Sequence, residues 1–369
     1  EIISEAIKVL KAISEKRNID FNFNYYDVGG IAIDKHSDPL PKSTLVACKN
    51  SDAVLFGAIG DPKFDNDPDS TLRPEQGLLK LRKELGLYAN LRPVKSYSQL
   101  VEFSPLKKDI IENVDMLIVR ELTGGLYFGE KKSSKTSASD LCEYSIDEIE
   151  RVTEIAVNYA KIRRKKITLI DKANVLETSR LWRKTVQNIS KKHTDINFEY
   201  MFVDNAAMQM IVNPKQFDVI LTENLFGDII SDEASVIGGS IGLLASASIG
   251  EGYALFEPIH GSAFDIMGKG IANPIGAFWS ASMMLDHLGE KKAAAELMLA
   301  LELLLRLSKF IITNPLKIKF TTWFIFTSLF FISYFLICFL VIPLSINLYF
   351  LSVLLIVFLV FLVQHHNCF

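Results

Sequence analysis

The sequence has few cysteines, and they show none of the spacings that build a structural centre. Its four cysteines, Cys48, Cys142, Cys338 and Cys368, are far apart and include no C-x-x-C pair. A disulfide framework or a zinc site is therefore disfavoured, and a reducing compartment fits best. The formal net charge is −3, so nothing indicates a nucleic-acid partner.

Two common nucleotide-binding fingerprints are also missing. The sequence contains no G-x-G-x-x-G run and no G-x-x-x-x-G-K-[ST] loop. A standard Rossmann dinucleotide site or a P-loop is therefore unsupported by the residues present.

The end of the chain lacks charge. After Lys319 no Asp, Glu, Lys or Arg occurs through Phe369. A helix of about 20 apolar residues spans a bilayer, so the run 320–363 is long enough for two membrane spans, broken near Pro343. The alternative is that this tail is not native coding sequence, and both interpretations stay open.

The beginning of the chain is also unusual. It starts at Glu1 rather than at methionine, inside the stretch IISEAIKVLKAI, which has helical spacing. We expect that the true start is missing, so targeting signals cannot be judged.

Residues 1–306 alternate between predicted strands and predicted helices. The strand-like runs are FNFNYYDVG (21–29), DAVLFGAIG (52–60), DMLIVRELTGG (115–125), KITLIDKAN (166–174) and FDVILTEN (217–224). The helical runs include 2–16, 145–166 and 179–192. This alternation indicates an α/β fold, whose ligands gather beyond the carboxyl ends of the strands. The residues to inspect are therefore 120–129, 171–174 and 222–232.

Two acids in the stretch ENLFGDIISDEAS suggest a metal site. In a helix, Asp228 and Asp232 share one face and repel each other by a few tenths of a kcal/mol. A divalent cation would reverse the sign of that interaction, and oxygen ligands suit Mg²⁺ or Mn²⁺. Asp204, after another strand-like run, is a candidate third ligand. Taken alone, the pair is more often two solvated helix acids.

Three arginines suggest an anionic substrate. Arg120 interrupts an apolar strand, where an unpaired guanidinium is costly and needs an anionic partner. Together with Arg82 and Arg92 it would suit a dicarboxylate through bidentate pairing. The alternatives are a surface helix residue for Arg82 and an internal ion pair for Arg120.

Tyr127 and Lys172 stand at the ends of two predicted strands. A lysine near a metal and arginines can act as a base, and a tyrosine can donate a proton. A packing tyrosine and a salt-bridged lysine are the alternatives.

The stretch FEPIHGSAFDIMGKGIANP (256–274) has few side chains suited to packing. A ligand-cradling loop is plausible there, in which Asp265 would hydrogen-bond ribose hydroxyls. The alternative is a turn-rich surface connection.

Taken together, these motifs resemble the β-decarboxylating dehydrogenases, the isocitrate/isopropylmalate dehydrogenase family, and its isopropylmalate branch in particular. The matching stretches are GGIAID, GLLKLRKELGLYANLRP, IVRELTGGLYFGE, DKANVLETSRLWRKTV, FVDNAAMQM, NLFGDIISDEAS and FEPIHGSAFDIMGKGIANP. They run in family order over residues 1 to about 300.

The resemblance implies a two-domain α/β fold that is not a standard Rossmann fold. Residues 1–87 and 241–306 would form the cofactor-side domain and 88–240 the substrate, metal and dimerisation domain, with 307–369 as the hydrophobic tail. It also implies NAD as oxidant, Mg²⁺ or Mn²⁺, and a homodimer with shared active sites. The enzyme body would be cytoplasmic or in an organelle's stroma or matrix, and membrane-bound if the tail is real.

The resemblance assigns roles residue by residue. Catalytic positions match Tyr127 and Lys172, and metal ligands match Asp204, Asp228 and Asp232. Substrate-binding positions match Glu75, Leu78, Leu79, Arg82, Arg92, Arg120 and Asp204. Cofactor-binding positions match His260, Gly261, Ser262, Ala263, Asp265 and Asn273. Family counterparts of Lys172 and Asp204 reach into the partner subunit's site. The packed side of the metal-site helix would be Leu225, Phe226, Ile229 and Ile230.

The implied reaction is the NAD-dependent oxidative decarboxylation of 3-isopropylmalate to 4-methyl-2-oxopentanoate, in leucine biosynthesis. Leu78 and Leu79 would form an apolar wall for the isopropyl group, although apolar discrimination is worth only about 1–3 kcal/mol per methylene. A related alkylmalate is therefore an alternative substrate. The family's opening strand and Gly-Asp-Gly loop are absent before Glu1, so an inactive or membrane-anchored form of the enzyme is the other alternative.

Overall fold

The computed structural model of the chain describes residues 1–65 and 71–313. The chain divides into two units, residues 1–299 and 300–369. The large sheet and all the predicted site residues lie in the first unit.

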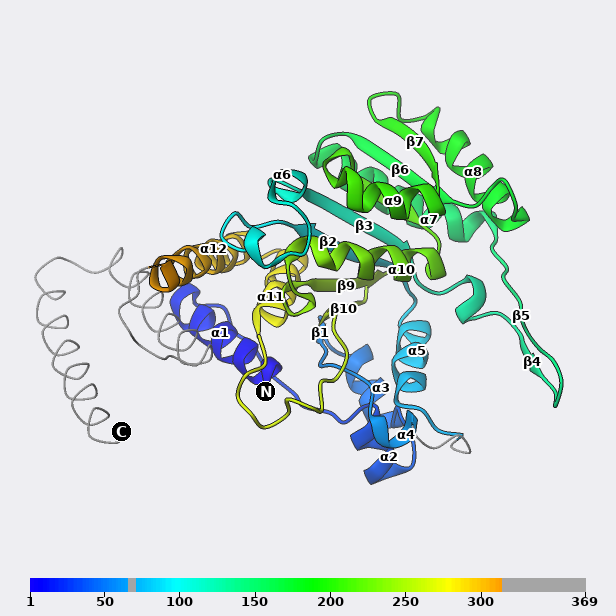
Figure 1. The fold of residues 1–369 in the computed structure, drawn as a ribbon. Coiled ribbons are helices and arrows are strands. Elements are labelled where there is room, and N and C mark those ends of the chain that lie inside the picture. The colour runs from blue at the N-terminus through cyan, green and yellow to red at the C-terminus, as the bar shows by residue number, and fades with distance from the viewer. Residues whose placement is uncertain (66–70, 314–369) are drawn as a thin grey trace, which may run out of the picture. The chain divides into compact units, whose positions relative to one another are not determined.

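The first unit is built on a mixed sheet of eight strands in the order β1-β10-β9-β2-β3-β8-β6-β7 (Figure 1). The strands are β1 (Val54–Leu55), β2 (Leu87–Lys95), β3 (Asp115–Glu121), β6 (Lys166–Asp171), β7 (Asn197–Phe202), β8 (Val219–Thr222), β9 (Ala245–Gly250) and β10 (Ala254–Pro258). The adjacent strands β3, β8, β6 and β7 are all parallel to one another, whereas β2 and β9 run antiparallel to their neighbours. A separate hairpin pairs β4 (Lys131–Ser133) with β5 (Ala138–Asp140).

Helices cover both faces of the parallel half of the sheet. Helices α9 and α10 lie on one face, and α7 and α8 lie on the other (Figure 1). The described helices are α1 (Ile2–Arg17), α2 (Gly30–His36), α3 (Lys42–Lys49), α4 (Pro62–Asp65), α5 (Pro74–Glu84), α6 (Lys108–Ile111), α7 (Ile146–Ile162), α8 (Glu177–Ser190), α9 (Val203–Val212), α10 (Asn224–Ser235), α11 (Ile275–His287) and α12 (Lys291–Thr313).

The predicted alternation of strands and helices is confirmed over most of the chain. The helical runs 2–16, 145–166 and 179–192 correspond to α1, α7 and α8, and the later strand-like runs correspond to β3, β6 and β8. In helix α7 a local sequence signal explains where the helix begins. Ser145 and Glu148 form a capping box at its start, and such a box satisfies backbone donors that a helix start leaves unpaired.

One strand prediction is wrong and a second is wrong in part. Residues 21–28 form no strand, because this segment pairs with no other strand in the described part of the chain. Its alternation instead brings the rings of Phe21 and Phe23 together, with centroids 5.7 Å apart. Of the run 52–60, only Val54–Leu55 is a strand, and it ends before Gly60, whose φ of 113° departs from extended backbone.

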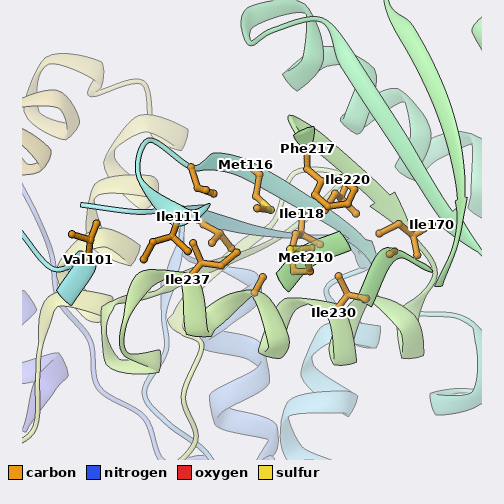
Figure 2. Packing of buried hydrophobic residues seen from close by; sticks show 14 residues of the cluster. Val101, Ile111, Met116, Ile118, Ile170, Met210, Phe217, Ile220, Ile230 and Ile237 are labelled. Carbon is orange, nitrogen blue, oxygen red and sulfur yellow. The ribbon is translucent and has the colours of Figure 1, made fainter. Parts of the chain in front are cut away.

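A buried apolar cluster attaches α9 and α10 to the sheet (Figure 2). It includes Ile118 of β3, Ile170 of β6 and Ile220 of β8, packed against Met210 of α9 and Ile230 of α10. All five side chains are at most 1% exposed. Burial of one such side chain contributes about 1.5–3 kcal/mol, so this cluster determines where the acidic residues of both helices stand.

The structure describes the two predicted domains, apart from residues 66–70, but not residues 314–369 of the predicted tail. The division into residues 1–87 with 241–306 and residues 88–240 stays a prediction. Within residues 1–65 and 71–313, no helix combines the length and the apolar character needed to cross a membrane. The predicted spans at 320–363 lie outside the described residues.

The contribution of α7 to the core can be measured with two matched substitutions. Ile149→Ala should lower the free energy of unfolding by about 2–5 kcal/mol, because the Ile149 side chain is 0% exposed. Ile162→Ala on the same helix should change it by less than about 0.5 kcal/mol, since Ile162 is 80% exposed. Urea unfolding measures both, and equal losses would contradict the packing described here.

Candidate active site

Arg120 is the best-anchored member of the candidate site. The alternation of β3 turns Arg120 to the same face as Ile118, toward α10, and leaves its side chain 2% exposed. Its Nε and Nη2 groups donate to Asn224 Oδ1 at 3.1 and 2.7 Å, and its Nη1 pairs with Asp228. A Cβ at Gly227 would lie 2.6 Å from Arg120 Cγ, so only glycine allows this approach. The internal acid pairing that the sequence left open for Arg120 is therefore present.

Arg92 reaches the same helix from the neighbouring strand β2. Its Nε donates to Asn90 Oδ1 at 2.9 Å, and its Nη1 donates to Ser231 Oγ at 2.5 Å and to Asp232 Oδ1 at 3.1 Å. Its Nη2 lies 3.5 Å from Asp228 Oδ1. Burial lowers the pKa of Arg92, an effect that Asp228 and Asp232 oppose.

Asp228 joins these contacts into one cluster. It accepts hydrogen bonds from both guanidinium groups, and the Tyr127 hydroxyl donates to its Oδ2 at 2.7 Å. Burial acts to raise the pKa of Asp228, but Arg120, the Tyr127 hydrogen bond and Arg92 together hold this pKa below its usual value. Asp228 is therefore ionised at neutral pH.

Tyr127 is held as a protonated phenol. Burial and then the hydrogen bond to Asp228 raise its pKa to about 12. The turn before it is fixed by Glu121, whose buried carboxylate accepts from the Thr123 and Gly124 amides, each at 2.8 Å. A Cβ at Gly125 would lie 2.3 Å from the Tyr144 hydroxyl. The double glycine after β3 therefore gives the chain the room to place Tyr127 beside α10.

Helix α10 confirms one prediction and corrects another. Its N-cap Glu223 accepts from the Leu225 and Phe226 amides, and Asp228 and Asp232 both pair with Arg92, as residues on one helical face would. The predicted packed side is wrong for Ile229, which is 57% exposed. The buried face is Asn224, Gly227, Ile230, Ser231, Ala234 and Ser235, because small and polar residues fit beneath the two arginines.

Lys172 and Asp204 form a second, separate pair. Lys172 follows β6, Asp204 lies in the first turn of α9, and Lys172 Nζ is 2.6 Å from Asp204 Oδ1. This hydrogen bond lowers the pKa of the exposed Asp204 carboxyl. The preceding residue, Asp171, accepts two hydrogen bonds from Arg183 at 2.8 Å each, which fixes the end of β6 next to Lys172.

The three predicted metal ligands do not meet within one chain. Asp228 and Asp232 lie together on α10, whereas Asp204 pairs with Lys172. In the described part of the chain, no three His, Cys, Asp or Glu side chains are grouped so as to hold a metal ion.

A pocket connects the predicted substrate and cofactor residues. Its lining includes Leu78, Arg82 and Arg92 together with His260 and Gly261. Leu78 also belongs to a buried core cluster, whereas Leu79 and Glu75 are partly exposed on the same helix α5. Arg82 is largely buried rather than on the surface, and its Nη2 lies 2.8 Å from Glu257 Oε1.

The predicted cofactor loop follows β10. The Ser262 amide donates to the Ile59 carbonyl at 3.1 Å, which ties the loop to the segment after β1. Asn273 Oδ1 accepts from the Ile275 amide at 3.0 Å and so caps the start of α11. Ser262, Ala263 and Asp265 are exposed, so the loop presents backbone and polar groups to solvent.

Four residues that bond the predicted arginines were not predicted from the sequence. They are Asn90, Asn224, Ser231 and Glu257, each of which bonds a predicted arginine. Asn90 and Asn224 are 0% exposed. An asparagine beside an apolar run was the available signal, since a buried amide needs hydrogen-bond partners.

The architecture is that of known decarboxylating dehydrogenases. It resembles an isocitrate dehydrogenase from Methylococcus capsulatus (TM-score 0.75, 35% identity, 82% of this chain and 86% of that chain covered). It also resembles a β-decarboxylating dehydrogenase from Thermococcus kodakarensis (TM-score 0.66, 37% identity, 85% and 84% covered).

The sequence comparisons identify the family. The family model "Isocitrate/isopropylmalate dehydrogenase" matches residues 1–318. The chain is 56% identical over 296 residues to a 3-isopropylmalate dehydrogenase from Wolinella succinogenes, covering 80% of this chain and 82% of the relative. It is 53% identical over 292 residues to one from Bacillus subtilis, covering 77% and 80%. The chain belongs to the isocitrate/isopropylmalate dehydrogenase family, a family of oxidoreductases.

The ionisation of Asp228 predicts a pH dependence of stability. Because the folded pKa of Asp228 is below its unfolded value of 3.8, its stabilising contribution is complete above that value and is lost as the pH falls through the folded pKa. At pH 7, Asp228→Asn should lower the free energy of unfolding by roughly 1–3 kcal/mol. Urea unfolding from pH 7 to pH 3 should show this difference shrinking below about pH 4. A difference that grows on acidification would contradict the assignment.

Proposed function

We propose that the chain oxidises and decarboxylates 3-isopropylmalate to 4-methyl-2-oxopentanoate with NAD, a step of leucine biosynthesis. The observation that carries the proposal is the pocket whose lining includes Leu78, Arg82 and Arg92 together with His260 and Gly261. An apolar group, a carboxylate and a nucleotide would each find suitable neighbours in it. The relatives at 51–56% identity, which are named 3-isopropylmalate dehydrogenase, support the same substrate.

The arginines would hold the malate carboxylates. Arg92 and Arg120 present their terminal nitrogens to Asp228, and a substrate carboxylate is the same kind of partner. Arg82 is joined to Glu257 at the pocket wall. Leu78, with Leu79 and Glu75 on α5, would face the isopropyl group. A third carboxylate, as in isocitrate, would meet apolar Leu78 instead of a cation.

The carboxylates of α10 fit a hard divalent cation. Asp228 and Asp232 offer oxygen ligands one helical turn apart, and Asp232 is largely open to solvent, as Mg²⁺ or Mn²⁺ with its retained waters requires. Asp204 would complete the set from the other subunit. When bound, the cation supplies Lewis-acid polarisation of the substrate oxygens.

The loop after β10 fits the adenosine side of NAD. His260 and Gly261 of this loop line the pocket, and Ser262, Ala263 and Asp265 beside them are exposed. The exposed carboxylate of Asp265 would accept from ribose hydroxyls and would repel a 2′-phosphate, so NAD is favoured over NADP. Bound NAD supplies the hydride acceptor.

The proton transfers are assigned to Lys172 and Tyr127. Lys172, once it has left Asp204 and given a proton to water, would be a neutral amine and would accept the proton of the substrate C2 hydroxyl. Tyr127 then donates a proton to the carbon that loses carbon dioxide. Its pKa of about 12 keeps the phenol protonated at neutral pH, so it is ready to donate. Arg92 and Arg120 keep the substrate oriented during both transfers.

A homodimer would complete the site. Asp204, Met208 and Ile211 recur along α9 at helical spacing, and Met208 and Ile211 are 52% and 47% exposed. On α10, Ile229 is 57% exposed next to Asp228. Exposed apolar residues beside functional acids are typical of a surface that a partner covers. We therefore propose that Lys172 and Asp204 serve the site of a second copy of the chain.

The reaction itself is tested by NADH formation. The chain with NAD and Mg²⁺ should oxidise 3-isopropylmalate with a kcat/KM at least about a hundredfold above that for isocitrate. Lys172→Met and Tyr127→Phe should each lower kcat by about 10²–10⁴-fold. The control Lys191→Met changes an exposed lysine of a surface hydrogen bond and should keep wild-type rates. Near-normal turnover in either site variant would refute its role, and preference for isocitrate would refute the substrate.

Shared sites predict complementation between inactive variants. Lys172→Met and Asp228→Asn chains should each be inactive alone. If Lys172 serves the partner's site, a mixed dimer has one intact site, so random mixing after reversible dissociation should restore about a quarter of wild-type activity. Sedimentation checks that both variants remain dimers. Dimeric mixtures that regain no activity would place both residues in one chain's site.

A further inference from the structure

We propose that two buried asparagines, Asn90 and Asn224, are positioning residues that hold the guanidinium groups of Arg92 and Arg120 without neutralising them. The identity of the ligand rests on the proposed function, whereas the contacts between these four side chains do not. The asparagines lie on different elements, β2 and α10, and neither belongs to a predicted catalytic or metal-binding set.

Asn224 contacts one arginine and one backbone carbonyl. Its Oδ1 accepts from Arg120 Nε at 3.1 Å and from Nη2 at 2.7 Å, and its Nδ2 donates to the Gly124 carbonyl at 3.1 Å. One amide thereby joins the end of β3 to the turn that precedes Tyr127. Its own backbone amide donates to the Tyr144 hydroxyl at 3.1 Å, so the anchor is itself fixed.

Asn90 makes the equivalent contact one strand away. Its Oδ1 accepts from Arg92 Nε at 2.9 Å, and its Nδ2 donates to Ser246 Oγ at 2.8 Å and to Ser248 Oγ at 3.1 Å. In the sheet, Asn90 of β2 stands directly opposite Arg120 of β3. Each arginine is thus held at Nε by a neutral amide on a rigid element.

The nitrogens that the asparagines bond determine which other nitrogens of each guanidinium can bind a further partner. Arg92 keeps both Nη groups directed at α10, and Arg120 keeps Nη1 directed at Asp228. These outer edges are the groups that a carboxylate ligand would use. The anchors therefore fix the direction of each arginine and leave Arg92 Nη1 and Nη2 and Arg120 Nη1 to other partners. In this structure those partners are Ser231, Asp232 and Asp228, and a ligand carboxylate would take the place of a carboxylate partner.

The neutrality of the anchors is the functional part of the inference. A carboxylate in place of Asn224 could accept the same two hydrogen bonds from Arg120, but it would lose the bond that Nδ2 donates to the Gly124 carbonyl and would add a full negative charge to a nearly dry cluster. Electrostatic interactions are strong at low dielectric, so the added charge would offset the attraction of Arg120 for a substrate carboxylate. An amide orients the arginine without that competition.

The test compares Asn224→Asp in two backgrounds. In the full chain, the substitution should raise the KM for 3-isopropylmalate by about tenfold or more, with the KM for NAD within about twofold. With Arg120→Lys already present, the same substitution should raise it less than about threefold, because lysine has no Nε group for the anchor to hold. The exposed control Asn188→Asp should change neither constant.

Several results would overturn the inference. An unchanged KM for 3-isopropylmalate in Asn224→Asp would refute it. Equal increases with and without Arg120→Lys, or equal increases for both ligands, would show a general structural role instead. If Asn224→Asp does not fold, Asn90→Asp is measured in wild-type and Arg92→Lys backgrounds with the same criteria.

A ligand-free measurement separates this inference from the proposed function. In ¹⁵N-arginine spectra, the Nε–H of Arg120, assigned with Arg120→Lys, should exchange slowly with water. Asn224→Ala should accelerate that exchange by about tenfold or more. If the wild type neither binds nor oxidises 3-isopropylmalate, the proposed function fails, and the exchange rate alone decides the role of Asn224. Unaltered exchange in Asn224→Ala would refute the anchor.

Discussion

The carboxylate of Asp228 is the contact on which the candidate site depends. It is shared by Arg92 of β2, Arg120 of β3 and the Tyr127 hydroxyl, so one side chain joins two strands, the turn after β3 and helix α10. Two guanidinium groups taken out of water are costly unless charges and hydrogen bonds compensate them. Asp228 supplies the shared charge, and its low pKa keeps that charge in place at neutral pH. The apolar cluster below α10 holds the helix at the distance that this pairing needs.

The polar contacts around the arginines divide into charged and neutral ones, with different consequences. Asp228 and Asp232 pair with Nη nitrogens of the two arginines. A substrate carboxylate would bind the same nitrogens. Asn90 bonds Nε of Arg92, and Asn224 bonds both Nε and Nη2 of Arg120, and neither amide adds a charge. Each arginine therefore has one neutral amide partner and at least one carboxylate partner. Gly227 makes this possible, because a side chain there would meet Arg120.

The residues proposed for the chemistry lie at two separate places of one chain. The arginines, Tyr127 and Asp228 form one cluster, and Lys172 with Asp204 forms an exposed pair. An ion pair open to water contributes little to stability, typically below about 1 kcal/mol, so folding alone gives little reason for this lysine to stand there. The exposed apolar residues on α9 and α10 supply a reason, since a second copy covering them would bring the two parts together.

Local periodicity and the order of the motifs were enough to predict most of the alternating helices and strands, the shared face of Asp228 and Asp232, and the family. Prediction from the sequence was wrong where a local pattern needed a distant partner. Residues 21–28 alternate but pair with no strand among residues 1–65 and 71–313, and Ile229 is apolar but exposed. Only the tertiary structure decided which groups the arginines contact: Arg120 and its anchor Asn224 are 104 positions apart, and Arg82 and Glu257 are 175 apart. No local spacing encodes such pairs, since they meet only when the sheet places β2, β3 and β10 beside the helices that follow them.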